Sequence, residues 1–199
     1  MTPAKIIAFS GSARRASINQ KLAVAAAEYA RAAGAAVTLI NLRDYPIPLF
    51  DQDLEAEYGE TDNARELKAL FAEHDGLLIA SPEYNGLLSP LLKNTLDWLS
   101  RRAGDEASML AYRGKTAALL ASSYGRLGGL RGLPHARALL TNLGVLTVPE
   151  QATVGGAADA FDDAGRLVRP ADAAQVERVA RSLVAAIDGR RAAGNGEKA

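Results

Sequence analysis

The chain has 199 residues, 48% of them hydrophobic, which is enough for one globular domain that buries a substantial core. Its 23 basic and 23 acidic residues balance, and no basic block or stripe points to a nucleic-acid partner. The absence of cysteine excludes disulfides, thiol nucleophiles and thiolate metal sites, and permits a reducing compartment.

The chain opens with a predicted strand, a polar turn and a helix. Residues 5–9 form an apolar run too short for a helix, and residues 20–33 are rich in Ala and Leu before the helix-stopping Gly34. The turn between them, residues 10–19, carries hydroxyl, amide and guanidinium groups. The free backbone N–H groups and the positive dipole at a helix N-terminus also attract anions. The turn is therefore a candidate phosphate site.

A simpler interpretation is a capped loop, with Ser17 or Asn19 as N-cap and the arginines solvated. Capping needs only one such residue, however, and four polar side chains crowd around Arg14: Ser10, Ser12, Ser17 and Asn19.

The spacing of glycines in the turn limits which phosphate-bearing ligands it can bind. The patterns G-x-x-x-x-G-K-[ST] and G-x-G-x-x-G are both absent, since Gly11 is the only glycine of the turn. A nucleoside triphosphate or a dinucleotide is therefore disfavoured. Hydroxyls and a guanidinium suit a terminal phosphate monoester, to which Arg makes paired, charge-assisted contacts. FMN carries such a group.

The rest of the chain alternates between predicted strands and helices. Proline and acidic residues make 41–60 an irregular loop, and residues 189–199 are expected to be a disordered tail. Further strands are predicted at 36–40, 76–80, 115–121 and within 144–154, and helices at 61–74, 90–99, 130–143 and 171–188.

This alternation implies an α/β fold, a doubly wound five-stranded parallel sheet with helices on both faces, spanning residues 1–188 as a single domain. Five strands suggest the order 2-1-3-4-5, in which the chain reverses direction between strands one and three. The loops after strands one, three and four then meet at one crevice. Those loops are the polar stretches 10–19, 81–86 and 122–129, and their shared position predicts the functional site.

Three motifs carry a resemblance to a known family. They are Gly11-Ser12-x-Arg14-x-x-Ser17-x-Asn19-x-x-Leu22-Ala23, then Ser81-Pro82-Glu83-Tyr84-Asn85 followed by Leu92-Lys93-Asn94-x-Leu96-Asp97-Trp98, and Gly125-x-x-Gly128-Gly129. Together they resemble the NAD(P)H-dependent FMN reductase family, which has a flavodoxin-like fold and includes enzymes described as quinone, chromate and azo reductases. The resemblance spans roughly the first two-thirds of the chain.

The resemblance implies a flavin site with NADPH or NADH as co-substrate. The acceptors would be quinone-like, azo or metal-oxyanion compounds or free flavin, and the protein a homodimer or homotetramer. The FMN phosphate would be held by Ser12, Arg14, Ser17 and Asn19. The ribityl chain and the ring would be bordered by Pro82, Glu83, Tyr84 and Asn85 and, from the third loop, by Ser122, Ser123 and Gly125.

Two departures from the family pattern bear on substrate access. Tyr124 stands where the family often has a small residue, and the segment 103–113 is unlike the family. Elsewhere, Glu83 must reach solvent or pair with a cation or a backbone donor. Asp97 and Trp98 are expected to serve packing and a subunit interface.

The expected chemistry needs no catalytic side chain, because a flavin carries the redox step. The two histidines have no spacing partner for a metal site or a Ser-His-Asp arrangement. Two alternatives stay open: a flavodoxin-like electron carrier, which the neutral charge disfavours, and a regulatory module that binds another phosphate-bearing ligand. No apolar run suits a membrane span or signal peptide, so we expect a soluble cytoplasmic protein without a membrane partner.

Overall fold

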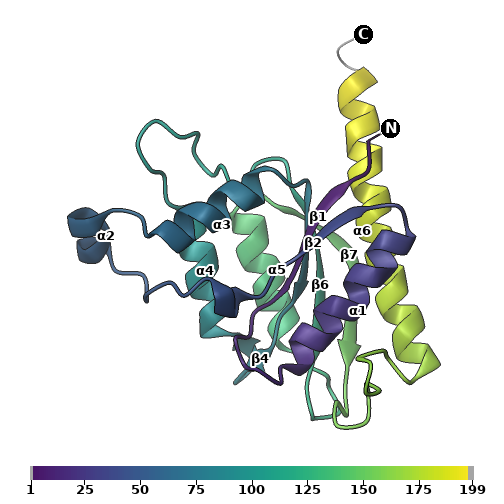
Figure 1. Ribbon diagram of the computed structural model, residues 1–199. Coiled ribbons are helices and arrows are strands. Elements are labelled where there is room, and N and C mark those ends of the chain that lie inside the picture. Colours follow the sequence, from purple (N-terminus) through teal and green to yellow (C-terminus); the bar gives the residue numbers. More distant parts are fainter. Residues whose placement is uncertain (1, 197–199) are drawn as a thin grey trace.

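The computed structural model describes residues 2–196, in which five parallel strands form a sheet of order β2-β1-β3-β6-β7 (Figure 1). This confirms the predicted order 2-1-3-4-5, because β6 and β7 are the fourth and fifth strands of this sheet along the chain. The strands are β1 (Lys5–Ser10), β2 (Ala36–Leu39), β3 (Gly76–Ala80), β6 (Thr116–Ser122) and β7 (Leu146–Val154).

Helices cover both faces of the sheet, as predicted. Along β1, Ile6 and Ala8 pack toward one helical layer and Ile7 and Phe9 toward the other, because successive strand residues point to opposite faces. Every residue of β3 and β6 is buried, which explains their continuous apolar sequences. One layer consists of α1 (Ile18–Ala32) and α6 (Pro170–Gly196), and the other of α3 (Asp62–Ala72), α4 (Pro90–Ser100) and α5 (Gly132–Asn142).

The stretch predicted as an irregular loop, 41–60, contains two short helices. They are η1 (Leu42–Asp44) and α2 (Gln52–Tyr58), and Figure 1 shows α2 standing away from the sheet and its helical layers. No residue of α2 is buried. Leu54, which is partly buried, is its contact with the core, and one apolar residue makes no periodic pattern that the sequence could show.

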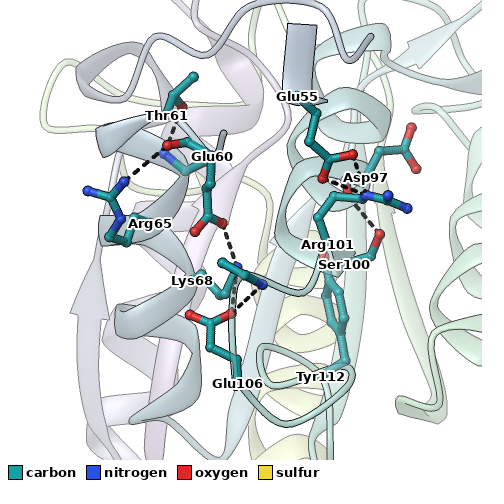
Figure 2. A network of polar contacts seen from close by, with 12 residues as sticks. Glu55, Glu60, Thr61, Arg65, Lys68, Asp97, Ser100, Arg101, Glu106 and Tyr112 are labelled. Carbon is teal, nitrogen blue, oxygen red and sulfur yellow. Dashed lines mark hydrogen bonds and ion pairs between the residues drawn. The ribbon is translucent and has the colours of Figure 1, made fainter. Parts of the chain in front are cut away.

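Ion pairs attach this projecting segment to the helical layer (Figure 2). Arg101, just after α4, lies 2.8 Å from Glu55 of α2. Lys68 of α3 is buried between Glu60, at 2.6 Å, and Glu106, at 2.8 Å. A buried ammonium group is tolerated only when it is paired, so Lys68 links the end of the projecting segment to the unusual segment 103–113.

The last helix is longer than predicted. The sequence pattern placed its end at Asp188, whereas α6 runs to Gly196, so residues 189–196 of the expected disordered tail are helical. Arg190 donates to the carbonyl of Lys115, and Arg191 donates to the carbonyl of Thr2 and a carboxylate oxygen of Asp75. These contacts extend the helix past Gly189, and they join residues too distant in sequence for a local pattern to predict. Residues 197–199 of the expected tail lie outside the described residues.

No helix between residues 2 and 196 is both long enough and apolar enough to span a bilayer.

Candidate active site

The loops after β1, β3 and β6 meet at the carboxyl-terminal edge of the sheet and line one pocket of about 190 Å³. This edge includes the β1–β3 boundary, where the chain reverses direction and open α/β sheets bind ligands. Nine of the eleven predicted residues line it: Ser12, Arg14, Ser17, Asn19, Pro82, Glu83, Tyr84, Ser122 and Ser123. The pocket lining also includes Ile18 and Tyr124, and does not include Asn85 or Gly125.

The start of α1 presents hydrogen-bond donors to this pocket. Ser17 is the N-cap, and its hydroxyl oxygen accepts the N–H of Gln20 at 3.1 Å, as the capped-loop interpretation required. The hydroxyl proton stays available for an anion. Ile18 and Asn19 line the pocket, and their amides are among the first of the helix, which have no intrahelical acceptor. Capping and anion binding are therefore compatible at this helix start.

Arg14 contributes a positive charge that no carboxylate of residues 2–196 balances. Its Nη2 donates to the carbonyl of Ala16 at 2.8 Å and to the hydroxyl of Tyr124 at 3.2 Å. Within residues 2–196, no Asp or Glu forms an ion pair with it. An unbalanced guanidinium beside a helix N-terminus produces a local field that favours a phosphate.

Asn19 joins the first loop to the third. It is 3% exposed, and its side-chain amide donates to the carbonyl of Ser122 at 2.9 Å and accepts the N–H of Ser122 at 2.8 Å. The Ser122 hydroxyl in turn donates to the carbonyl of Val154 at 2.9 Å. Both side chains thus have internal partners and hold the pocket walls together.

The loop after β3 folds as a hairpin of β4 (Glu83–Tyr84) and β5 (Leu87–Leu88). Asn85 and Gly86 connect these strands with positive φ angles of 53° and 86°. A two-residue Asn-Gly connection of this kind is typical of a type I′ turn, whose backbone twist suits a hairpin. The structure therefore gives Asn85 a role in the turn, away from the pocket lining.

Glu83 is paired, as its place at the end of a central strand required. Its side chain is only 8% exposed, and Oε1 lies 2.7 Å from Nε of Arg131. Oε2 accepts the backbone N–H of Arg131 at 3.0 Å, at the start of α5. The carboxylate therefore pairs with a cation and caps a helix, and these contacts fix the hairpin against α5.

Two glycines shape the third loop. Gly128 and Gly129 have φ angles of 61° and 89°. A Cβ atom would lie 2.8 Å from the backbone of Gly155 at the first position and 2.8 Å from Cβ of Ala121 at the second. The motif Gly125-x-x-Gly128-Gly129 is thus largely a requirement of backbone packing.

Neither histidine is among the residues that line the pocket. Both ring nitrogens of His74 have partners, Nδ1 at the carbonyl of Leu70 and Nε2 at the hydroxyl of Thr38, each at 2.8 Å. Across residues 2–196, no group of three or more His, Cys, Asp or Glu side chains is arranged to hold a metal ion.

Comparison with known proteins identifies the family. The model of the NADPH-dependent FMN reductase family matches residues 4–159. The chain belongs to this family. It is 34% identical over 176 residues to a quinone reductase of Pseudomonas putida, covering 85% of this chain and 89% of the relative. It is also 35% identical over 166 residues to an NAD(P)H-dependent FMN reductase of Pseudomonas aeruginosa, covering 82% and 84% of the two chains.

The fold agrees with this assignment. FerB, a flavoenzyme NAD(P)H:(acceptor) oxidoreductase from Paracoccus denitrificans, superimposes with a TM-score of 0.77 at 23% identity, covering 94% of this chain and 98% of FerB. Membership of the FMN reductase family confirms the predicted class of protein, an oxidoreductase that uses FMN and NAD(P)H.

Proposed function

We propose that this FMN reductase is a quinone-type reductase that binds FMN in the pocket between the first and third loops. The unbalanced charge of Arg14, beside the start of α1, is the observation that carries this proposal. When bound, FMN accepts a hydride from the nicotinamide and passes reducing equivalents to the acceptor. The protein then has to hold the flavin, expose it and exclude competing reactions.

The phosphate end of the site consists of Arg14, Ser12, Ser17 and the first amides of α1. Arg14 can donate a charge-assisted N–H group to the phosphate, and Ser17 one O–H group. Asn19 acts indirectly, since its amide holds the backbone of Ser122. The pocket thus fits a phosphate monoester without a metal ion or a glycine-rich loop.

The ring end of the site consists of Pro82, Tyr84 and Ser123, with Glu83 and Ser122 fixing the backbone around it. Tyr84 and Tyr124 line the pocket and are 55% and 60% exposed. Exposed aromatic side chains offer flat apolar surface to a planar acceptor. Together with relatives named quinone reductases, this favours quinones as acceptors. Azo compounds, metal oxyanions and free flavin are further candidates.

We also propose that the protein assembles as a homodimer or homotetramer through the rim of this pocket. Several large apolar side chains of the second and third loops are 42% to 60% exposed: Tyr84, Leu87, Tyr124, Leu127 and Leu130. Exposed apolar patches of this kind mark interaction surfaces. Light scattering at micromolar concentration tests this, and a fully active monomer contradicts it.

Trp98 serves packing, as predicted, and the place of its helix in an interface stays a prediction. The side chain is completely buried, its ring packs edge-to-face on Phe50, and its Nε1 donates to the carbonyl of Pro48 at 2.8 Å. Trp98 therefore anchors the projecting segment on α4. Its neighbour Asp97 is partly exposed and pairs with Lys93 at 2.6 Å.

Initial-rate kinetics test the proposed activity. With FMN-loaded protein, NADPH oxidation measured at several quinone concentrations should give parallel double-reciprocal lines, because one pocket serves both substrates in turn. Free FMN at the same concentration, without protein, is the control. Converging lines would contradict a ping-pong mechanism, in which the two substrates occupy one site in turn. The absence of turnover above the control would contradict the proposed function.

A further inference from the structure

Tyr124 lies at the mouth of the pocket, and its recorded polar contact is with Arg14. Its hydroxyl oxygen accepts a hydrogen bond from Nη2 of Arg14 at 3.2 Å. The guanidinium carbon lies 6.0 Å from the ring centroid, at the outer limit of a cation–π contact. We propose that Tyr124 is a positioning residue, which orients Arg14 for the FMN phosphate. The inference rests on the proposed function.

The contacts of Arg14 leave a defined set of donors free. Nη2 carries two N–H groups, and its two acceptors are the carbonyl of Ala16 and the hydroxyl of Tyr124. No hydrogen-bond acceptor for Nε or Nη1 of Arg14 exists among residues 2–196. These free N–H groups are the donors that a phosphate can use.

Fixing the guanidinium before the ligand arrives should strengthen binding. A free arginine side chain samples many rotamers, and immobilising it on binding reduces affinity. Tyr124 and Ala16 hold one end of the guanidinium in the free protein, so less freedom is lost when the phosphate binds. Arg14 is exposed and has no carboxylate partner within the described chain, so these neutral contacts are what restrain it.

A buried contact holds the backbone close to Tyr124. Asn19 holds both backbone groups of Ser122, two residues before Tyr124, in a buried contact. Two links therefore connect the start of α1 with the third loop, a buried one at Asn19 and an exposed one at Arg14. Because Tyr124 is 60% exposed, removing its hydroxyl should change ligand binding with little effect on folding.

The test is a double-mutant cycle between Tyr124→Phe and Arg14→Ala, with dissociation constants of FMN and riboflavin measured by fluorescence titration. Tyr124→Phe keeps the ring and removes the hydrogen bond to Arg14. We expect FMN binding to weaken about 2- to 12-fold, the range for one neutral hydrogen bond, and riboflavin binding to stay unchanged. In the Arg14→Ala background, Tyr124→Phe should have no further effect on FMN.

Tyr84→Phe is the matched control, because Tyr84 lines the same pocket and makes no recorded contact with Arg14. Its effect on FMN affinity should be the same in both backgrounds. Equal effects of Tyr124→Phe in both backgrounds would overturn the inference. So would equal weakening of FMN and riboflavin, since Tyr124 would then act on the ring.

The outcomes separate this inference from the proposed function. If the unmodified protein does not bind FMN, the proposed function fails. If it binds FMN more tightly than riboflavin, and Arg14→Ala removes that preference while Tyr124→Phe does not change it, only the role of Tyr124 fails.

Discussion

Replacing Arg14 with alanine tests the phosphate end of the site. The change removes a guanidinium whose recorded contacts are Ala16 and Tyr124, so the fold loses little. A charge-assisted hydrogen bond contributes about 1.5–3 kcal/mol, which corresponds to about 10- to 150-fold in the FMN dissociation constant. Because Arg14 is exposed and salt screens its charge, we expect the lower half of this range at physiological ionic strength.

The assay compares FMN with riboflavin, which has the same ring and no phosphate. Fluorescence titration should show weaker FMN binding by Arg14→Ala and nearly unchanged riboflavin binding. Arg15→Ala is the matched control, because Arg15 is an exposed neighbour outside the pocket lining. Thermal unfolding confirms that each variant is folded. Equal losses for the two ligands would refute a phosphate contact and make the first loop a capped turn only.

Three further changes probe the surrounding structure. Asn19→Ala leaves the buried N–H and carbonyl of Ser122 without partners, so we expect urea denaturation to show a loss of about 2–4 kcal/mol; a loss below about 0.5 kcal/mol would show that the link is dispensable. Glycine readily adopts the φ of 53° found at Asn85, so Asn85→Gly should leave the turn intact and FMN affinity within about twofold. A roughly tenfold loss of affinity would show that the Asn85 side chain contacts the ligand. The hydrogen bond from Lys68 lowers the pKa of Glu106, so this pair stabilises the fold above the pKa of the unfolded chain and ceases to do so as pH falls through the folded pKa. Glu106→Gln should therefore reduce the loss of stability as pH falls below about 4.3, the ordinary pKa of glutamate, and an unchanged pH profile would contradict the pairing.

The sequence predicted the sheet well because its central strands are buried on both faces. The continuous apolar run at 76–80 is β3, whose position and length agree with the prediction. By contrast, α2 has no buried residue and therefore no periodic pattern. Asn85-Gly86 is a hairpin signal, whereas the family resemblance places Asn85 in the flavin site.

The sequence predicts which loops form the site. It does not predict which side chains of those loops contact one another. Topology brings the carboxyl ends of parallel strands together, so polar residues after those strands could be grouped in advance. The links from Asn19 to Ser122 and from Glu83 to Arg131 connect residues 103 and 48 positions apart. Such pairs depend on how loops pack in three dimensions. In the sequence Tyr124 stands out only as a departure from the family pattern, and the structure shows its contact with Arg14.

A spectral titration without oxygen tests the central claim most directly. The FMN-loaded protein is mixed with NADPH, and a quinone is then added, while the visible flavin absorbance is followed. We predict that one equivalent of NADPH removes the absorbance without a partner protein and that one equivalent of quinone restores it. Absorbance that persists with NADPH and NADH and falls only when a separate reductase is added would contradict the account and identify an electron carrier.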